Sequence, residues 1–157
     1  MIQRIQTVYL LLSMAFVAMV TFGATIFQFD AVGISYKLSA CALNKYNAGS
    51  ELIEIDPSYL YIAGITLLAL SLLTIFTFKN QKRQLALGQF TAVLYFIFLV
   101  LMIIASFMGA DLTGEQEVTR SFGFGFYAFI IGLPFLILAN IGIKRDKKLL
   151  DSVNRLR

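Results

Sequence analysis

The stretch YLYIAGITLLALSLLTIFTF, residues 59–78, runs for 20 positions without a charged side chain. A helix that rises about 1.5 Å per residue would cover about 30 Å over this length, which matches the hydrocarbon core of a membrane. The polar segment KNQKRQ, residues 79–84, follows, and a second charge-free stretch then occupies residues 85–108. This order predicts two antiparallel membrane-spanning helices that are joined by a short polar turn.

Two further charge-free stretches, at residues 7–29 and 122–143, are also long enough to cross a membrane. In lipid, a spanning segment has to satisfy its own backbone hydrogen bonds, so each stretch should be a helix. The chain has 157 residues and is 59% hydrophobic, whereas soluble domains contain about 45–50% apolar residues. We therefore predict an all-α membrane protein: a single domain, residues 1–157, with four transmembrane helices and a basic tail at residues 144–157.

Basic residues fall mainly on one side of these four spans. Of the thirteen Lys and Arg residues, only Lys37, Lys45 and Arg120 lie in the two connections on the opposite side. Every acidic residue except Asp146 and Asp151 lies on that opposite side. Because Lys and Arg favour cytoplasmic loops, both termini of this multi-pass protein are predicted to be cytoplasmic.

The longest connection, residues 30–58, is expected on the outer side of the membrane. Two segments in it, VGISYKL at residues 32–38 and ELIEI at residues 51–55, alternate apolar and polar residues on either side of NAGS. Such alternation is typical of half-buried strands. We expect these two segments to pair as a short β-hairpin in the first outer loop.

The predicted spans contain no Asp, Glu, Lys, Arg or His, and the whole chain has no His and one Cys. Charged groups inside the membrane mark most proton relays and ion pathways, and His is the commonest general base. The sequence therefore predicts no catalytic residue, no enzyme activity, no metal or cofactor site and no small-molecule substrate. Polar side chains such as Gln89 and Asn140 are expected to form hydrogen bonds between helices. As an alternative, Gln89, Asn140 and a kink at Pro134 could line a path in an oligomeric transporter or channel component.

Two glycines and a proline in the last span favour close helix packing. Gly125 and Gly132 are seven residues apart in the sequence, so they share one helix face, which could admit a neighbouring backbone. Pro134 has no N–H group for the carbonyl of Ile130 and should kink the helix near the middle of the membrane. We predict a helix-packing role for Gly125, Gly132 and Pro134.

The terminal segment IKRDKKLLDSVNRLR, residues 143–157, has the pattern of an amphipathic basic helix. Its apolar stripe consists of Leu149, Leu150, Val153 and Leu156. The helix could lie on anionic lipid or on the protein's own cytoplasmic turns, or it could dock on a protein partner. Contact with RNA or the ribosome through Lys and Arg is a further alternative.

Both ends of the chain carry a recognisable pattern. MIQRIQTVYLLL, residues 1–12, contains Arg4-Ile5-Gln6, and the matching positions of the tail are Lys144, Asp146, Ser152, Arg155, Leu156 and Arg157. With these residues the whole chain resembles the domain-of-unknown-function 4293 family, which comprises small four-helix proteins of the bacterial inner membrane. Family members read Asp-Glu-Lys-Leu-Val and then Asp-Arg-Leu-Arg in the tail, from which this chain departs at Lys147 and Asn154. The resemblance implies the fold and an inner-membrane location, and it implies no activity.

The predicted orientation places Arg4-Ile5-Gln6 and the tail on the same face of the membrane. We expect Arg4 or Gln6 to contact the tail, with Asp146 or Asp151 as the acceptor for Arg4. The predicted partner-binding residues are Arg4, Gln6, Lys144, Asp146, Arg155 and Arg157.

The function that we expect is that of a non-catalytic accessory or scaffolding subunit of a larger inner-membrane complex. A basic cytoplasmic face could lie beside a ribosome, so protein export or insertion machinery is the first candidate for that complex. The expected partners are membrane lipid and proteins of the complex, with ribosome or RNA contact as a lesser alternative.

Overall fold

The structure of the protein, a computed structural model, describes residues 3–31, 33–47, 51–112 and 119–155. Its helices are α1 (Gln3–Thr21), α2 (Leu60–Phe76), the short 3-10 helix η1 (Thr77–Lys79), α3 (Gln81–Leu112) and α4 (Phe124–Arg155). Its strands are β1 (Thr25–Ala31), β2 (Ile34–Ser39), β3 (Ala42–Asn47), β4 (Leu52–Pro57) and β5 (Thr119–Phe122).

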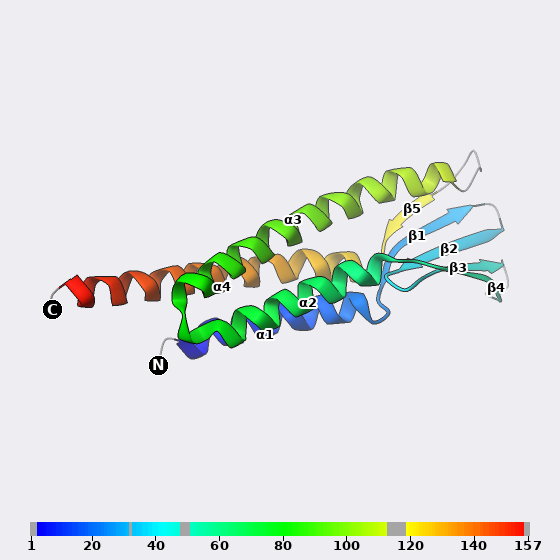
Figure 1. Ribbon diagram of the computed structural model, residues 1–157. Coiled ribbons are helices and arrows are strands. Elements are labelled where there is room, and N and C mark those ends of the chain that lie inside the picture. The colour runs from blue at the N-terminus through cyan, green and yellow to red at the C-terminus, as the bar shows by residue number, and fades with distance from the viewer. Residues whose placement is uncertain (1–2, 32, 48–50, 113–118, 156–157) are drawn as a thin grey trace.

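Figure 1 shows the helices as an elongated bundle, with the strands gathered at one end and both termini at the other. We call these the sheet end and the terminal end. The terminal end comprises residues 3–6, 77–84 and 140–155. α1 and α3 run toward the sheet and α2 and α4 run back, and α1 has its most extensive contacts with α4.

The strands form one antiparallel sheet in the order β4-β3-β2-β1-β5. Apolar and polar side chains alternate along β1: Phe27 and Phe29 are buried, and Gln28 and Asp30 lie on the opposite face of the strand. Gln28 Nε2 donates to the Asp30 carboxylate at 3.0 Å. The ring of Phe27 lies 5.4 Å from that of Phe126, centroid to centroid, which attaches the sheet to α4. The prediction of an all-α protein was therefore wrong.

The first predicted span, residues 7–29, was too long because its last residues belong to a strand of the sheet. α1 ends at Thr21, and Gly23 follows with a φ of 139°, a backbone conformation that side-chain-bearing residues rarely adopt. Residues 25–31 then form β1, whose buried side chains are as apolar as those of a membrane helix. Phe122, the predicted start of the fourth span, belongs to β5, which pairs with β1. A count of charge-free positions measures hydrophobicity and does not distinguish a buried strand from the continuation of a helix.

The predicted hairpin was also wrong in its pairing. The segment VGISYKL contributes to β2 and ELIEI to β4, but β3 lies between these two strands and pairs with both. Two contacts between a cation and an aromatic ring join β2 to β3: Lys37 Nζ lies 4.9 Å from the ring centroid of Tyr46, and Lys45 Nζ lies 5.7 Å from that of Tyr36. Side chains of both strands thus contribute to this pairing, and β3 is a strand that the alternation of apolar and polar residues did not predict.

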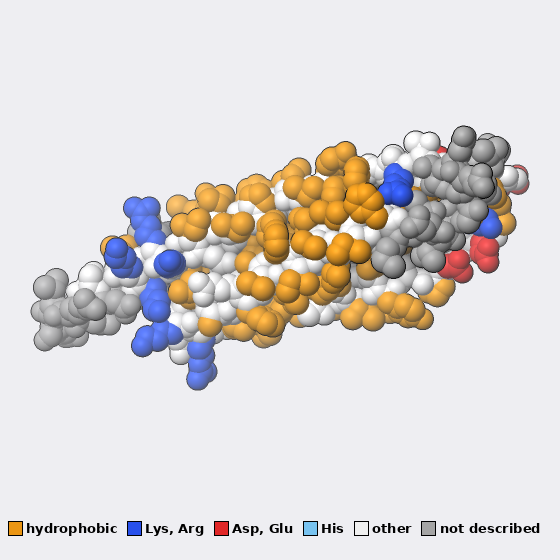
Figure 2. Space-filling view, turned by 90° about the horizontal axis from the view of Figure 1, so that it is seen from above, with side chains coloured by type: hydrophobic (Ala, Val, Ile, Leu, Met, Phe, Trp, Pro, Cys, Tyr) orange, Lys and Arg blue, Asp and Glu red, His pale blue; other side chains and the backbone are white. Residues whose placement is uncertain are grey.

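Three of the described helices are long and apolar enough to cross a membrane, over Leu60–Lys79, Gln81–Phe107 and Phe124–Leu149. The apolar part of α1, Ile5–Thr21, is shorter and runs beside α4. Figure 2 shows a broad band of hydrophobic side chains between basic groups near the terminal end and acidic groups at the sheet end. This distribution is typical of a membrane protein.

The helices of the bundle meet where a side chain of one helix lies against a glycine of another. A Cβ atom added to the glycine would overlap or crowd that side chain in four pairs: Gly64 with Thr21, Gly88 with Asn140, Gly132 with Tyr95, and Gly142 with Gln6. Asn140 Nδ2 also donates to the Gly88 carbonyl at 2.8 Å. We call these the polar–glycine contacts, and they follow the preference of membrane helices for small residues and interhelical hydrogen bonds.

Candidate functional site

A buried contact between α1 and α4 fixes the terminal end. Gln6 is 5% exposed and Asp146 is 8% exposed, and Gln6 Nε2 donates a hydrogen bond to Asp146 Oδ2. Gly142, one turn before Asp146, allows this approach, because an added Cβ atom would lie 2.8 Å from Gln6 Cγ. The prediction that residues 4–6 reach the tail is confirmed for Gln6, and its acceptor is Asp146.

The surroundings of Asp146 separate two faces of α4. A buried carboxylate is costly unless it is paired, and Asp146 Oδ1 has no hydrogen-bond partner among the described residues. Lys144, Arg145 and Lys148 are exposed. These residues lie one or two positions from Asp146 and therefore point away from it around the helix. The carboxylate consequently holds one face of α4 against α1 while the basic side chains project from the others.

The turn between α2 and α3 adds positive charge at the same end. Lys79, Lys82 and Arg83 are exposed there. Figure 2 shows the basic side chains as a band next to the edge of the hydrophobic surface. Such a concentration of one sign of charge attracts anionic groups in general and does not by itself select one partner.

The structure describes the side chains of only some of the predicted partner-binding residues. Lys144 is exposed, and Asp146 is buried against Gln6, so Asp146 positions α4. Arg4 lies in α1 and Arg155 is the last residue of α4, but the side chains of both lie outside the described part of the chain. Arg157 also lies outside the described residues.

Gly125 and Gly132, which we expected on one packing face, contact different partners. A Cβ atom on Gly125 would lie 2.9 Å from the carbonyl oxygen of Thr25, the first residue of β1, and 3.0 Å from that of Ala24 before it. Gly132 lies against the hydroxyl-bearing ring of Tyr95 on α3. Pro134 lies inside α4, which continues as one helix on both sides of it. Gly125 therefore admits a close backbone, but that backbone is the start of β1 and the residue before it, and not a neighbouring helix.

Gln89 and Asn140, the residues of the alternative transport path, line one groove between α3 and α4. This groove has a volume of about 580 Å³ and is bounded by residues within 85–93 and 137–144, so it covers the half of the bundle near the terminal end. Pro134 is not part of its lining. The expected interhelical hydrogen bond of Asn140 is confirmed by its bond to the Gly88 carbonyl.

Four residues of the polar–glycine contacts were missed by sequence reasoning: Gly64, Gly88, Tyr95 and Gly142. A glycine inside a helix costs about 1 kcal/mol relative to alanine, so a glycine in an apolar helix indicates a close approach. That signal is present at all three glycines. The residue that approaches Gly88 is Asn140, 52 positions away, and the residue that approaches Gly142 is Gln6, 136 positions away. Periodicity within one helix carries no information about such distant neighbours.

Comparison with known proteins gives one clear result. No curated protein matches the sequence. The sequence profile of the family described as Domain of unknown function (DUF4293) matches residues 2–156, which is nearly the whole chain. The resemblance noted at the two ends of the sequence is thereby confirmed, and the chain belongs to the DUF4293 family.

Proposed function

We propose that this protein is a non-catalytic scaffolding subunit of a larger assembly in the bacterial inner membrane, and that it docks its partner through the part of α4 that leaves the bundle. The observation that carries the proposal is the buried contact of Gln6 with Asp146. This contact holds the end of α4 in one orientation while Lys144, Arg145 and Lys148 remain exposed. A surface that is fixed before binding loses less conformational entropy when a partner docks.

The distribution of charge supports an orientation with the terminal end in the cytoplasm. Basic side chains gather at the terminal end and acidic ones at the sheet end (Figure 2). Lys and Arg are enriched in cytoplasmic segments of membrane proteins. In this orientation the sheet lies on the outer side of the membrane and the end of α4 projects into the cytoplasm.

The direction of α4 favours a protein partner over a lipid surface. An amphipathic helix that anchors to lipid lies in the plane of the membrane. The end of α4 instead continues along the axis of the bundle, beyond the other helices (Figure 1). Leu149, which is 50% exposed, lies beside the exposed Lys148 and supplies an apolar contact within a basic surface.

Purification from the native cell tests this proposal. An affinity tag placed in the connection after Asn47 leaves the terminal end free, and proteins that copurify in mild detergent are identified by mass spectrometry. The docking variant carries Lys144→Glu, Arg145→Glu and Lys148→Glu, which reverse exposed charges and leave Asp146 intact. The matched control carries Lys79→Glu, Lys82→Glu and Arg83→Glu, the same change in charge at the same end of the bundle.

A defined membrane complex should copurify with the wild-type protein and with the control, and it should be lost from the docking variant. Components of the export or insertion machinery are the first partners to look for. A complex that survives in the docking variant contradicts the proposal, as does an equal loss from both variants, which would indicate general attraction to RNA or anionic lipid. A protein that purifies alone or only with copies of itself also contradicts it, and ion flux in liposomes would then test the transporter alternative.

A further inference from the structure

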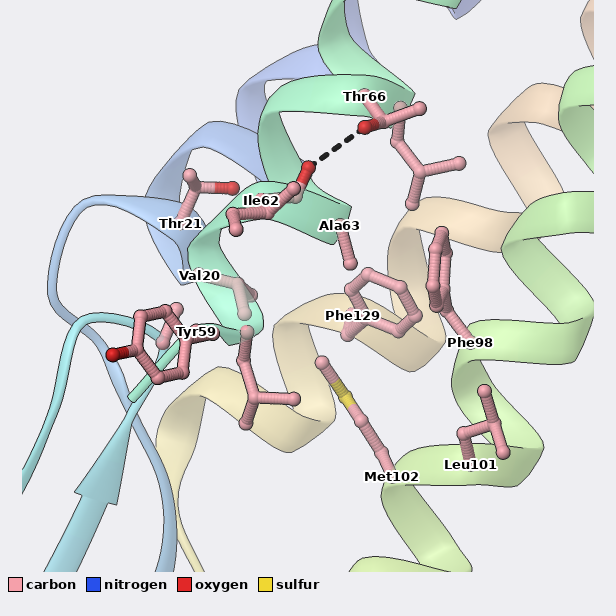
Figure 3. A pocket seen from close by; sticks show the side chains of 14 residues that line it. Val20, Thr21, Tyr59, Ile62, Ala63, Thr66, Phe98, Leu101, Met102 and Phe129 are labelled. Atoms are coloured by element: carbon pink, nitrogen blue, oxygen red, sulfur yellow. Dashed lines mark hydrogen bonds between the residues drawn. The ribbon is translucent and has the colours of Figure 1, made fainter. Parts of the chain in front are cut away.

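A cavity of about 410 Å³ lies between α2 and α3 at the sheet end of the bundle. Figure 3 shows its walls: Ala63 on α2 and Phe98 on α3 face each other, and Phe129 of α4 and Val20 of α1 lie deeper. This volume is within the range of about 300–1,000 Å³ that is typical of small-molecule sites. The cavity is distinct from the proposed docking surface, which comprises Lys144, Arg145, Lys148 and Leu149 of α4 at the terminal end.

The course of the helices explains why the cavity exists. The short η1 turn keeps α2 and α3 together at the terminal end, and the two helices diverge toward the sheet (Figure 1). At that end, Gly64 lets α2 pack closely on Thr21 of α1. Because α2 is drawn to α1 and carries only the small side chain of Ala63 beside Gly64, the space toward α3 stays unfilled.

The lining of the cavity selects an apolar occupant. The hydroxyl of Thr21 already donates to the Val17 carbonyl at 2.8 Å, and that of Thr66 donates to the Ile62 carbonyl at 2.8 Å. The described residues with unpartnered buried side-chain atoms all lie outside this lining. A water molecule held in a cavity needs two to four polar partners. The cavity therefore offers water few partners and offers an apolar molecule a continuous surface.

The surroundings of the cavity's mouth indicate which apolar molecule can enter the cavity. The mouth lies between two helices that are long and apolar enough to cross a membrane. Ile62 and Leu101, which line the cavity, are also 53% and 51% exposed on the outside of the bundle. In a bilayer these side chains touch lipid chains, so an acyl chain is the apolar molecule available to enter. A chain that enters exchanges one hydrocarbon surrounding for another, so retention depends on the fit of the cavity rather than on hydrophobicity.

Tyr59 indicates how the lipid is oriented. Its ring is 71% exposed at the rim toward the sheet, and its hydroxyl points away from the cavity (Figure 3). Tyrosine side chains favour the boundary between hydrocarbon and headgroups. We propose that the cavity binds one acyl chain of a membrane phospholipid, whose headgroup lies beside Tyr59 at the sheet end.

Lipid retention in two matched variants tests the proposal. Ala63→Phe fills the cavity, and Ala69→Phe adds the same ring to the exposed side of α2. The purified full-length protein in mild detergent is examined by native mass spectrometry. Wild type and Ala69→Phe should retain one phospholipid per chain, and occupancy should fall about tenfold or more in Ala63→Phe, since the added ring occupies the space that the acyl chain would fill. Equal retention in the two variants, or a wild-type protein that is free of lipid or dimeric without lipid, would overturn the proposal.

A fluorescence measurement avoids any dependence on the folding of Ala63→Phe. The chain has no Trp, so Phe98→Trp places a single reporter in the cavity and Phe96→Trp places one on the exposed face of α3. Phospholipid with brominated acyl chains is added to each protein in detergent micelles. Quenching at position 98 should saturate at a small mole fraction of the lipid, whereas quenching at position 96 should rise in proportion to it. The same dependence at both positions would overturn the proposal.

Discussion

The terminal end and the sheet end of the bundle are held together in different ways. At the terminal end, Gln6 bonds to Asp146 and Asn140 bonds to the Gly88 backbone, so directional contacts join α4 to both of its neighbours. At the sheet end, α2 and α3 diverge around an apolar cavity of about 410 Å³. Hydrogen bonds between buried groups specify one arrangement, whereas contacts around a cavity depend on what fills it. The bundle thus has a terminal end that is joined by directional hydrogen bonds and a sheet end that contains an apolar cavity.

The largest expected effect comes from closing a polar–glycine contact near the terminal end. Gly88→Leu places its side chain where Asn140 lies and should lower the free energy of unfolding by about 3 kcal/mol, through overpacking and loss of the interhelical hydrogen bond. Ala86→Leu, on the exposed side of α3, is the control and should have little effect. Unfolding in mixed micelles measures both. Equal stability of the two variants would show that the contact does not fix the helices.

The contact of Gln6 with Asp146 should show energetic coupling. Gln6→Ala and Asp146→Ala should each destabilise the protein, and the double variant should lose about 1–2 kcal/mol less than the sum of the single losses, because the second change removes no further hydrogen bond. A double-mutant cycle with the exposed Lys148→Ala in place of Asp146→Ala serves as the reference. Coupling energies that are equal in the two cycles would contradict a specific role for Asp146.

A smaller effect is expected where a polar–glycine contact borders the cavity. Gly64→Ala introduces a Cβ atom that overlaps the Thr21 hydroxyl and should cost about 1–2 kcal/mol. The same substitution in a Thr21→Ala background should cost clearly less, because the overlapping oxygen is gone. Thermal unfolding of the four proteins in one detergent measures this rescue. An identical cost in both backgrounds would show that the loss of stability does not come from the overlap with Thr21.

The smallest effect is expected on the sheet itself. Lys45 Nζ lies 3.9 Å from the Glu54 carboxylate, and the two side chains are 30% and 58% exposed. An ion pair in this setting is screened by water, so Glu54→Gln should change the free energy of unfolding by less than about 0.5 kcal/mol. A larger loss of stability in denaturation experiments would show that the edge of the sheet contributes more than its exposure suggests.

The sequence predicted the helical part of this fold well and the sheet poorly. The charge-free stretches 59–78 and 85–108 correspond closely to spans in the structure, because uninterrupted hydrophobicity is a property of each segment alone. Strand β1 was merged with the first span because Thr25–Phe29 contains no charge. Strand β5 has four residues, and its pairing with β1 joins positions about ninety residues apart, which no local pattern reveals.

The candidate site could be predicted only as far as the orientation of the spans decides which segments lie on the same side. Charge asymmetry predicted that residues 4–6 and the tail lie on the same side, and it led to the prediction that Arg4 or Gln6 contacts the tail, which the bond of Gln6 to Asp146 confirms for Gln6. The choice between Arg4 and Gln6 as the donor required the rotation of α1 about its axis. The cavity could not be predicted either, since it depends on the divergence of α2 from α3 and on the packing of Gly64 against Thr21.

Distances between spin labels test the contrast between the two ends most directly. In a protein with Cys41→Ala, one pair of labels is placed at positions 82 and 148, and another at positions 62 and 104, all of which are exposed. We predict a narrow distance distribution for the terminal pair with or without lipid, and a broad distribution for the sheet-end pair that narrows when phospholipid is added to the micelles. A terminal pair as broad as the sheet-end pair, or a sheet-end pair that does not respond to lipid, would contradict the proposed division between a fixed end and an adjustable one.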